Sequence, residues 1–241
     1  GLEPGESWAL EPQPLAGNPH LWTPGIKWNV PAGGATHRTE FFGPVLGVMR
    51  AENLEQAVAL ANQTGYGLTA GLESLDRREQ DRWKDRIRAG NLYVNRGTTG
   101  AVVLRQPFGG MGQSALGAGI KTGGPHYVTQ FLEAKEIGPP PAGPLASPHP
   151  LLRIAQRWRH RLDCNGFGRD TDDVRKAILA IHSYLYWVET EFSRKIDFFH
   201  LRGQDNILRH LPVGSVVVQL HAEDSLFEIL ARICAVRATG N

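Results

Sequence analysis

The sequence predicts an α/β fold, followed by a proline-rich linker and a second, truncated α/β domain. Up to about residue 137, short apolar runs alternate with amphipathic segments, which is typical of a sheet whose strands are joined by helices. Six prolines then fall between residues 138 and 150, where they block helix and central-strand formation. Helical and strand patterns resume afterwards. We therefore assign residues 1–137 and 151–241 to two domains and residues 138–150 to a linker.

The first domain is predicted to follow a β-α-β-α-β order. Asn53 followed by Gln56 is typical of a helix start, and the glycines at 65 and 67 are typical of its end. Because strands joined by crossover helices pair in parallel, we expect a largely parallel sheet. The expected elements are strands at residues 44–49, 68–72 and 91–95, a helix after Asn53, and a charged helix over residues 76–88.

A long glycine-rich segment follows these elements. Nine glycines lie between residues 96 and 124, and a loop of this length is usually functional or disordered. Residues 127–132 then predict a further strand, just before the linker.

The second domain is predicted from one long helix, one strand and one capped helix. A helix beginning near Thr171 carries an apolar stripe that we expect to be buried. Residues 216–220 read as a strand, and Ser225 with Glu228 as a capping box before a last helix. Gly240 is the expected terminator of that helix. The apolar stripe of the helix that begins near Thr171 consists of Val174, Ile178, Ile181, Leu185, Val188 and Phe192.

Composition excludes several classes of protein. Lys and Arg number 26 against 24 Asp and Glu, for a net charge of +2, and the charges are interspersed. A nucleic-acid partner is therefore not expected, because phosphate binding needs a clustered basic face. No run approaches the roughly 18 apolar residues that span a bilayer. Two cysteines cannot form a disulfide framework, which favours a reducing, cytoplasmic location.

The residues that usually carry metal or thiol chemistry are not arranged for it. The nine histidines include no HExxH motif, and the two cysteines lie far apart in sequence, so no zinc site is expected. Cys234 falls on the apolar face of its predicted helix and reads as a packing residue. Nothing around Cys164 marks a reactive thiolate. We assign no catalytic residue.

Two segments suggest ligand binding. Residues 40–44 place a carboxylate and two aromatics before a predicted strand, although this pattern taken alone favours a solvated Glu and two core Phe. Residues 98–101 and 106–110 offer small residues whose backbone amides can converge on an anion, although a plain surface loop has the same composition.

Three motifs resemble the C-terminal third of an aldehyde dehydrogenase. They are TEFFGPVL at residues 39–46, GNLYVNR at residues 90–96 and QPFGGMGQS at residues 106–114. The combination NRGTTGA at residues 95–101 is similar to the L-glutamate γ-semialdehyde dehydrogenases. Beyond the linker, LRGQDN at residues 201–206 and DSLFE at residues 224–228 resemble the extra C-terminal domain of long bifunctional proline utilisation A proteins.

The resemblance implies roles for five residues. In this family the Glu matching Glu40 accepts hydrogen bonds from the ribose hydroxyls of NAD, and the aromatic matching Phe42 packs beside the nicotinamide. The amides of Gly100 and Ala101 are implied to bind the α-carboxylate of L-glutamate γ-semialdehyde, and Phe108 to cover its aliphatic stem. These contacts orient the aldehyde for hydride transfer.

The resemblance also implies what this chain does not carry. The family's nucleophilic Cys, its water-activating Glu and its dinucleotide-binding sheet precede the matched region, so we expect an inactive fragment whose main partner is the rest of a parent polypeptide. That parent is implied to hold a flavin-dependent proline dehydrogenase domain with FAD. The sequence leaves homo-oligomerisation open. Two other hypotheses remain, a non-catalytic assembly or active-site-covering module and a phosphate-binding domain built on the glycine-rich loop.

Overall fold

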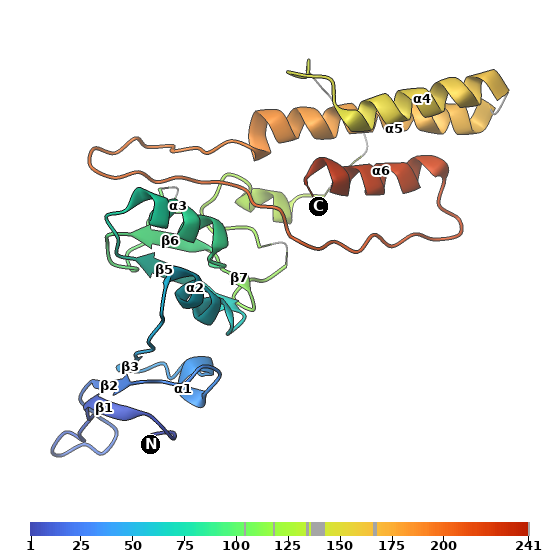
Figure 1. The fold of residues 1–241 in the computed structure, drawn as a ribbon. Helices are drawn as coiled ribbons and strands as arrows, with labels where there is room; N and C mark the ends of the chain where they lie inside the picture. The colour runs from blue at the N-terminus through green and yellow to red at the C-terminus, as the bar shows by residue number, and fades with distance from the viewer. Residues whose placement is uncertain (104, 118, 134, 136–142, 166–167, 241) are drawn as a thin grey trace. The chain divides into compact units, whose positions relative to one another are not determined.

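The protein forms two compact units, Gly1–Gln130 and Phe131–Asn241 (Figure 1). The computed structural model describes residues 1–103, 105–117, 119–133, 135, 143–165 and 168–240. Of the predicted linker, residues 138–142 lie outside the described residues, and the boundaries at 137 and 151 stay a prediction. Within the described part of the chain, the structure is a mixture of helices and strands, as predicted.

The first sheet has three strands in the order β1-β2-β3. β1 (Ser7–Leu10) pairs antiparallel with β2 (Gly25–Trp28), and β2 pairs in parallel with β3 (Val45–Gly47). The short helix α1 (Ala35–Arg38) lies in the crossover between the two parallel strands. Of these strands, only β3 lies in a segment that the sequence predicted as a strand.

A buried charge explains why hydrophobic patterning did not indicate β2. Lys27 in the middle of the strand is 6% exposed, because its ammonium group forms an ion pair with Glu6 at 3.0 Å. It also donates to the Thr36 hydroxyl and to the Gly1 carbonyl. A charge is buried only when such partners are present, and these partners lie far from Lys27 in sequence.

The middle of the first unit is a parallel strand pair covered by two helices. β5 (Thr69–Leu72) pairs in parallel with β6 (Asn91–Val94), in full register from Thr69↔Asn91 to Leu72↔Val94. α2 (Leu54–Asn62) and α3 (Arg77–Arg86) pack against this pair, as Figure 1 shows. Their buried core consists of Val58, Trp83 and Ile87.

Local signals define both helix starts as predicted. The Asn53 side chain accepts a hydrogen bond from the Gln56 amide at 2.9 Å, and the Asp76 carboxylate accepts one from the Arg78 amide at 2.8 Å. The parallel pairing of β5 and β6 is also as predicted. The expectation that residues 44–49 join the same sheet is wrong, because β3 pairs with β2 instead.

The glycine-rich segment is mostly loop, with one short strand. β7 (Met111–Gly112) pairs antiparallel with β4 (Tyr66–Gly67). The predicted strand at 127–132 is wrong, since residues Tyr127–Phe131 form a 3-10 helix. Its amides bond locally, from Tyr127 to the Gly124 carbonyl and from Thr129 to the His126 carbonyl. These amides therefore do not need the hydrogen bonds that a neighbouring strand would supply.

The second unit is built on three packed helices, α4 (Pro150–Asn165), α5 (Gly168–Trp187) and α6 (Leu226–Ala238). α5 packs against both α4 and α6. The predicted stripe of α5 is buried at Val174, Ile181 and Leu185 and half-buried at Ile178, but Phe192 is 41% exposed. A π-helical turn over Val188–Phe192 changes the residue period there and rotates the stripe away from the core.

The end of the second unit is partly as predicted. Ser225 and Glu228 form the expected capping box, and Gly240 has the left-handed φ of +84° that suits a helix terminator. The predicted strand at 216–220 is wrong. This segment makes no strand pairing within the described residues, and a strand needs a neighbour with which to form backbone hydrogen bonds. Val217 is 92% exposed.

Across the part of the chain that the structure describes, none of the helices combines the length and apolar character needed to cross a membrane.

Candidate functional site

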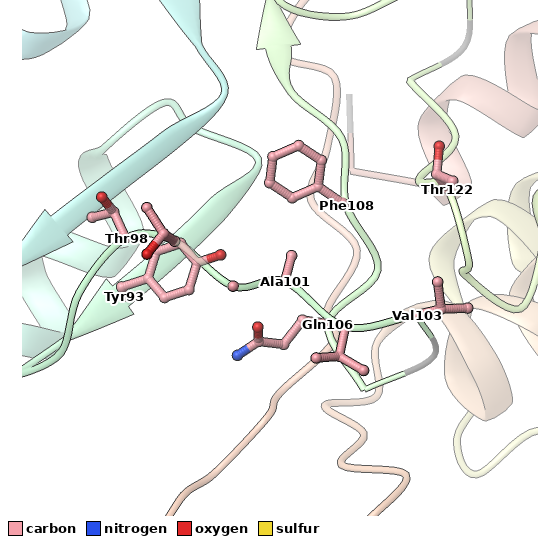
Figure 2. Close-up of a pocket in the computed structure, with 10 residues that line it drawn as sticks. Tyr93, Thr98, Ala101, Val103, Gln106, Phe108 and Thr122 are labelled. Carbon is pink, nitrogen blue, oxygen red and sulfur yellow. The ribbon is translucent and has the colours of Figure 1, made fainter.

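A cavity of about 420 Å³ opens between the end of β6 and the glycine-rich loop. It brings together all three residues that the resemblance implied for substrate binding, Gly100, Ala101 and Phe108. Figure 2 shows the Phe108 ring projecting from its loop toward the side occupied by Tyr93 and Thr98. The other lining residues are Thr99, Val102, Val103, Gln106 and Thr122.

The segment at Gly100 and Ala101 lines this cavity. Within the described residues, neither amide donates a hydrogen bond to another group. Gly100 has a φ of +82°, and a Cβ built there meets nothing within 4 Å. The local backbone is therefore of the left-handed type that glycine favours, and space is open for a ligand. Two adjacent free amides suit a carboxylate.

Phe108 forms an apolar wall of the cavity. Its amide donates to the Thr122 carbonyl at 3.0 Å, and the Thr122 amide donates back to the Phe108 carbonyl at 2.9 Å. Phe108 is 36% exposed, which leaves part of its surface available for an aliphatic chain. A carboxylate-binding end beside an apolar wall fits a short, amphipathic acid.

Tyr93 is a lining residue that the sequence analysis did not single out. Its side chain is 3% exposed, and its hydroxyl has no hydrogen-bond partner within the described residues. The Arg96 guanidinium carbon lies 5.6 Å from the ring centroid, close enough for a cation–π contact. The available signal was its position, because it faces inward on a predicted strand that runs directly into the loop.

The predicted cofactor residues lie outside this cavity. Glu40 and Phe42 follow α1 on the approach to β3, and both are exposed, Phe42 by 93%. Glu40 makes no hydrogen bond or ion pair with the described residues. Phe42 has a φ of +50°, an uncommon value for an aromatic residue. A free carboxylate and an open ring fit the diol and the flat face of a nicotinamide nucleotide.

Both cysteines belong to the second unit. Cys164 is exposed on α4, and Cys234 packs against the helical core of the second unit. Burial raises the pKa of the Cys234 thiol, which keeps it protonated and poorly nucleophilic at neutral pH. Its packing role is therefore as predicted. Among the described residues, no group of three or more His, Cys, Asp or Glu side chains is arranged to hold a metal ion.

A second hollow, of about 590 Å³, lies on α4 and was not predicted. It is lined by Arg153, Gln156, Arg157, His160 and Arg161. These residues recur every three or four positions and therefore share one face of the helix.

The aldehyde dehydrogenase family model matches residues 5–137 of the chain. A 1-pyrroline-5-carboxylate dehydrogenase from Bacillus cytotoxicus is 43% identical over 98 residues, which are 41% of this chain and 19% of that protein. A protein of the same name from a Geobacillus species is 42% identical over 98 residues, with the same coverage. The chain thus spans about a fifth of the length of these curated relatives.

Among solved structures, Proline Utilization A from Corynebacterium freiburgense is similar over 99% of this chain and 23% of its own. The TM-score is 0.76 and the sequence identity is 37%. This likeness extends through both units, whereas the family model ends at residue 137. The motifs, the fold and the family match agree, and the chain belongs to the aldehyde dehydrogenase family.

Proposed function

We propose that this chain supplies the substrate-anchoring and cofactor-contacting segments of an NAD-dependent L-glutamate γ-semialdehyde dehydrogenase in proline catabolism. The observation that carries the proposal is the cavity itself, where Gly100, Ala101 and Phe108 meet. The similarity to 1-pyrroline-5-carboxylate dehydrogenases supports the choice of substrate, because that compound is the cyclic form of the same semialdehyde.

The residues divide the work of binding. The free amides of Gly100 and Ala101 hold the α-carboxylate, and Phe108 packs against the methylene stem. This fixes the direction in which the aldehyde end points, and orientation of this kind contributes several kcal/mol to a two-substrate reaction. Glu40 accepts hydrogen bonds from the ribose hydroxyls of NAD, and Phe42 packs beside its nicotinamide. When bound, NAD supplies the acceptor for the hydride that leaves the substrate.

The covalent chemistry is assigned to residues outside this chain. The resemblance implies that the nucleophilic Cys precedes the matched region, and a thiol nucleophile must reach the aldehyde carbon. We therefore expect the isolated chain to be inactive and the activity to belong to a longer polypeptide. The likeness to Proline Utilization A over both units supports a bifunctional parent with an FAD-dependent proline dehydrogenase domain. A cytoplasmic location is part of this proposal.

The test uses the full-length protein that carries this chain. We expect NADH formation with L-glutamate γ-semialdehyde, and we expect Glu40→Ala to raise the Kd for NAD by tenfold or more, because two hydrogen bonds to an ionised acceptor are lost. Glu52→Ala, which removes another exposed carboxylate, is the control and should change neither quantity. Unchanged NAD affinity and NADH formation in Glu40→Ala would refute the cofactor assignment.

A further inference from the structure

The backbone on both sides of Phe108 is held by the side chain of Asn91. Asn91 is the first residue of β6, and its Nδ2 donates to the Pro107 carbonyl at 3.1 Å. Its Oδ1 accepts from the Gly109 amide, also at 3.1 Å. One amide group therefore grips the residue before Phe108 and the residue after it, and uses both a donor and an acceptor to do so.

Lys121 closes the same arrangement from the other side. Its ammonium group donates to the Gly90 carbonyl, to the Gly109 carbonyl at 2.7 Å and to Asn91 Oδ1 at 3.2 Å. An ammonium has three N–H donors, and each of them has an acceptor. No carboxylate pairs with Lys121 in the described part of the chain, and burial lowers its pKa to about 8.

The start of β6 and the loop around Gly109 are in close backbone contact. A Cβ added to Gly90 lies 1.7 Å from the Gly109 carbonyl oxygen, and one added to Gly109 lies 3.3 Å from Lys121. The loop that carries Phe108 is thus seated directly on the start of β6, and Thr122, next to Lys121, pairs with Phe108 itself. Neither Asn91 nor Lys121 lines the cavity.

We propose that Asn91 and Lys121 are positioning residues that fix the Phe108 wall and thereby set the chain length of the aldehyde that the cavity accepts. This inference rests on the proposed function. Phe108 is more than a third exposed, so side-chain packing does not by itself hold it, and its place depends on the backbone. We call the hydrogen bonds that Asn91 and Lys121 make to this loop the clamp. If these bonds are removed, Phe108 shifts and no longer fits the methylene stem of the substrate.

The kinetic test compares two substrates in the full-length protein. We expect Asn91→Ala and Lys121→Met each to raise KM for L-glutamate γ-semialdehyde about tenfold, because misplacing a positioning group weakens substrate binding. We expect kcat to stay within about twofold, since neither side chain contacts the reacting atoms. The preference over the one-carbon-shorter L-aspartate β-semialdehyde should fall. Lys121→Arg, which keeps several donors, should recover much of the loss.

The two residues should also behave as one unit. Because Lys121 donates to Asn91, the double variant should be little worse than either single variant. Asn62→Ala is the matched control. Its side chain also bridges two segments, with Nδ2 on the Arg86 carbonyl at 3.0 Å and Oδ1 on the Arg88 amide at 2.8 Å, but it lies away from the cavity. That variant should leave both KM values unchanged.

A second readout does not depend on activity. Hydrogen exchange at the amides of Phe108 and Gly109 should accelerate at least tenfold in Asn91→Ala and remain unchanged in Asn62→Ala. Unaltered exchange, or unaltered substrate preference in a folded and active Asn91→Ala enzyme, would overturn the inference. If Asn91→Ala does not fold, Lys121→Met takes its place in the exchange measurement, because it removes the donors to the Gly109 carbonyl and to Asn91 Oδ1. A wild-type protein that does not oxidise the semialdehyde refutes the proposed function, and the exchange data then decide the clamp separately.

Discussion

The Tyr93 hydroxyl is a buried polar group with no partner in the described residues. Such a group lowers stability by about 1–3 kcal/mol relative to a satisfied one. We therefore expect Tyr93→Phe to leave the free energy of unfolding unchanged or to raise it by up to about 1 kcal/mol, as measured by urea denaturation. Tyr66→Phe, at a residue that is 55% exposed, is the control and should have no effect. A clear loss of stability in Tyr93→Phe would show that the hydroxyl has a partner.

At the level of single residues, the structure brings together three of the five residues that the resemblance singled out. Gly100, Ala101 and Phe108 come from motifs that lie close together in the chain, and a loop that folds back on β6 is enough to bring them into one place. Glu40 and Phe42 lie in the loop between α1 and β3, whereas the cavity is lined by β6 and the loop that follows it. Their roles stay predictions. Tyr93 was missed because a strand aromatic reads first as core.

At the level of elements, the stability of the start of α3 depends on pH through Asp76. The side chain and amide of Arg78 hold the pKa of Asp76 at about 2, below its ordinary 3.8. The unfolded chain therefore binds a proton before the folded one, so the stabilisation is complete above pH 3.8 and is lost as the pH falls toward 2. Asp76→Asn keeps a capping acceptor but does not titrate.

The measurement is the free energy of unfolding between pH 5 and pH 2. The decline should be shallower in Asp76→Asn than in the wild-type chain. Asp81→Asn, within the same helix, does not alter the N-cap and serves as the control. Identical pH profiles for wild-type and Asp76→Asn would contradict the assignment of this ion pair as a determinant of acid stability.

Helix starts and strand pairings were not equally predictable. Asn53, Asp76 and Ser225 cap helices through bonds that reach only two or three residues along the chain, so the sequence alone identifies them. Strand pairing depends on distant segments. The β2–β3 pair was missed and the predicted strands at 127–132 and 216–220 do not form, because nothing local in the sequence reports whether a neighbour is present.

At the level of the whole molecule, we expect the second unit to affect the coupled conversion of proline to glutamate more than the oxidation of the semialdehyde itself. The non-catalytic hypothesis for this unit stays open, since its helices form a core of their own. Deleting residues 151–241 from the full-length protein should slow the conversion of proline to glutamate more than the oxidation of added semialdehyde. The two rates are compared by NADH formation from each substrate. Equal effects on both would indicate a folding role only.

The fold class of the molecule was more predictable than the arrangement of its strands in sheets. Alternating apolar runs and helices, with family motifs in the correct order, indicated an α/β aldehyde dehydrogenase segment, and the family match agrees. The arrangement of the described strands in three small sheets was not predictable. Each of these sheets has only two or three strands, and such small sheets depend on neighbours for stability.

The buried ion pair between Lys27 and Glu6 ties the first residues of the chain to the segment that leads to Glu40 and Phe42. Removing residues 1–6 would leave an ammonium group in an apolar setting without its counter-charge, a severe defect in any protein interior. The β2–β3 pair would then be expected to open, and Phe42 would lose the backbone that presents it. A few N-terminal residues thus help to hold the backbone of the surface that is proposed to receive the nucleotide.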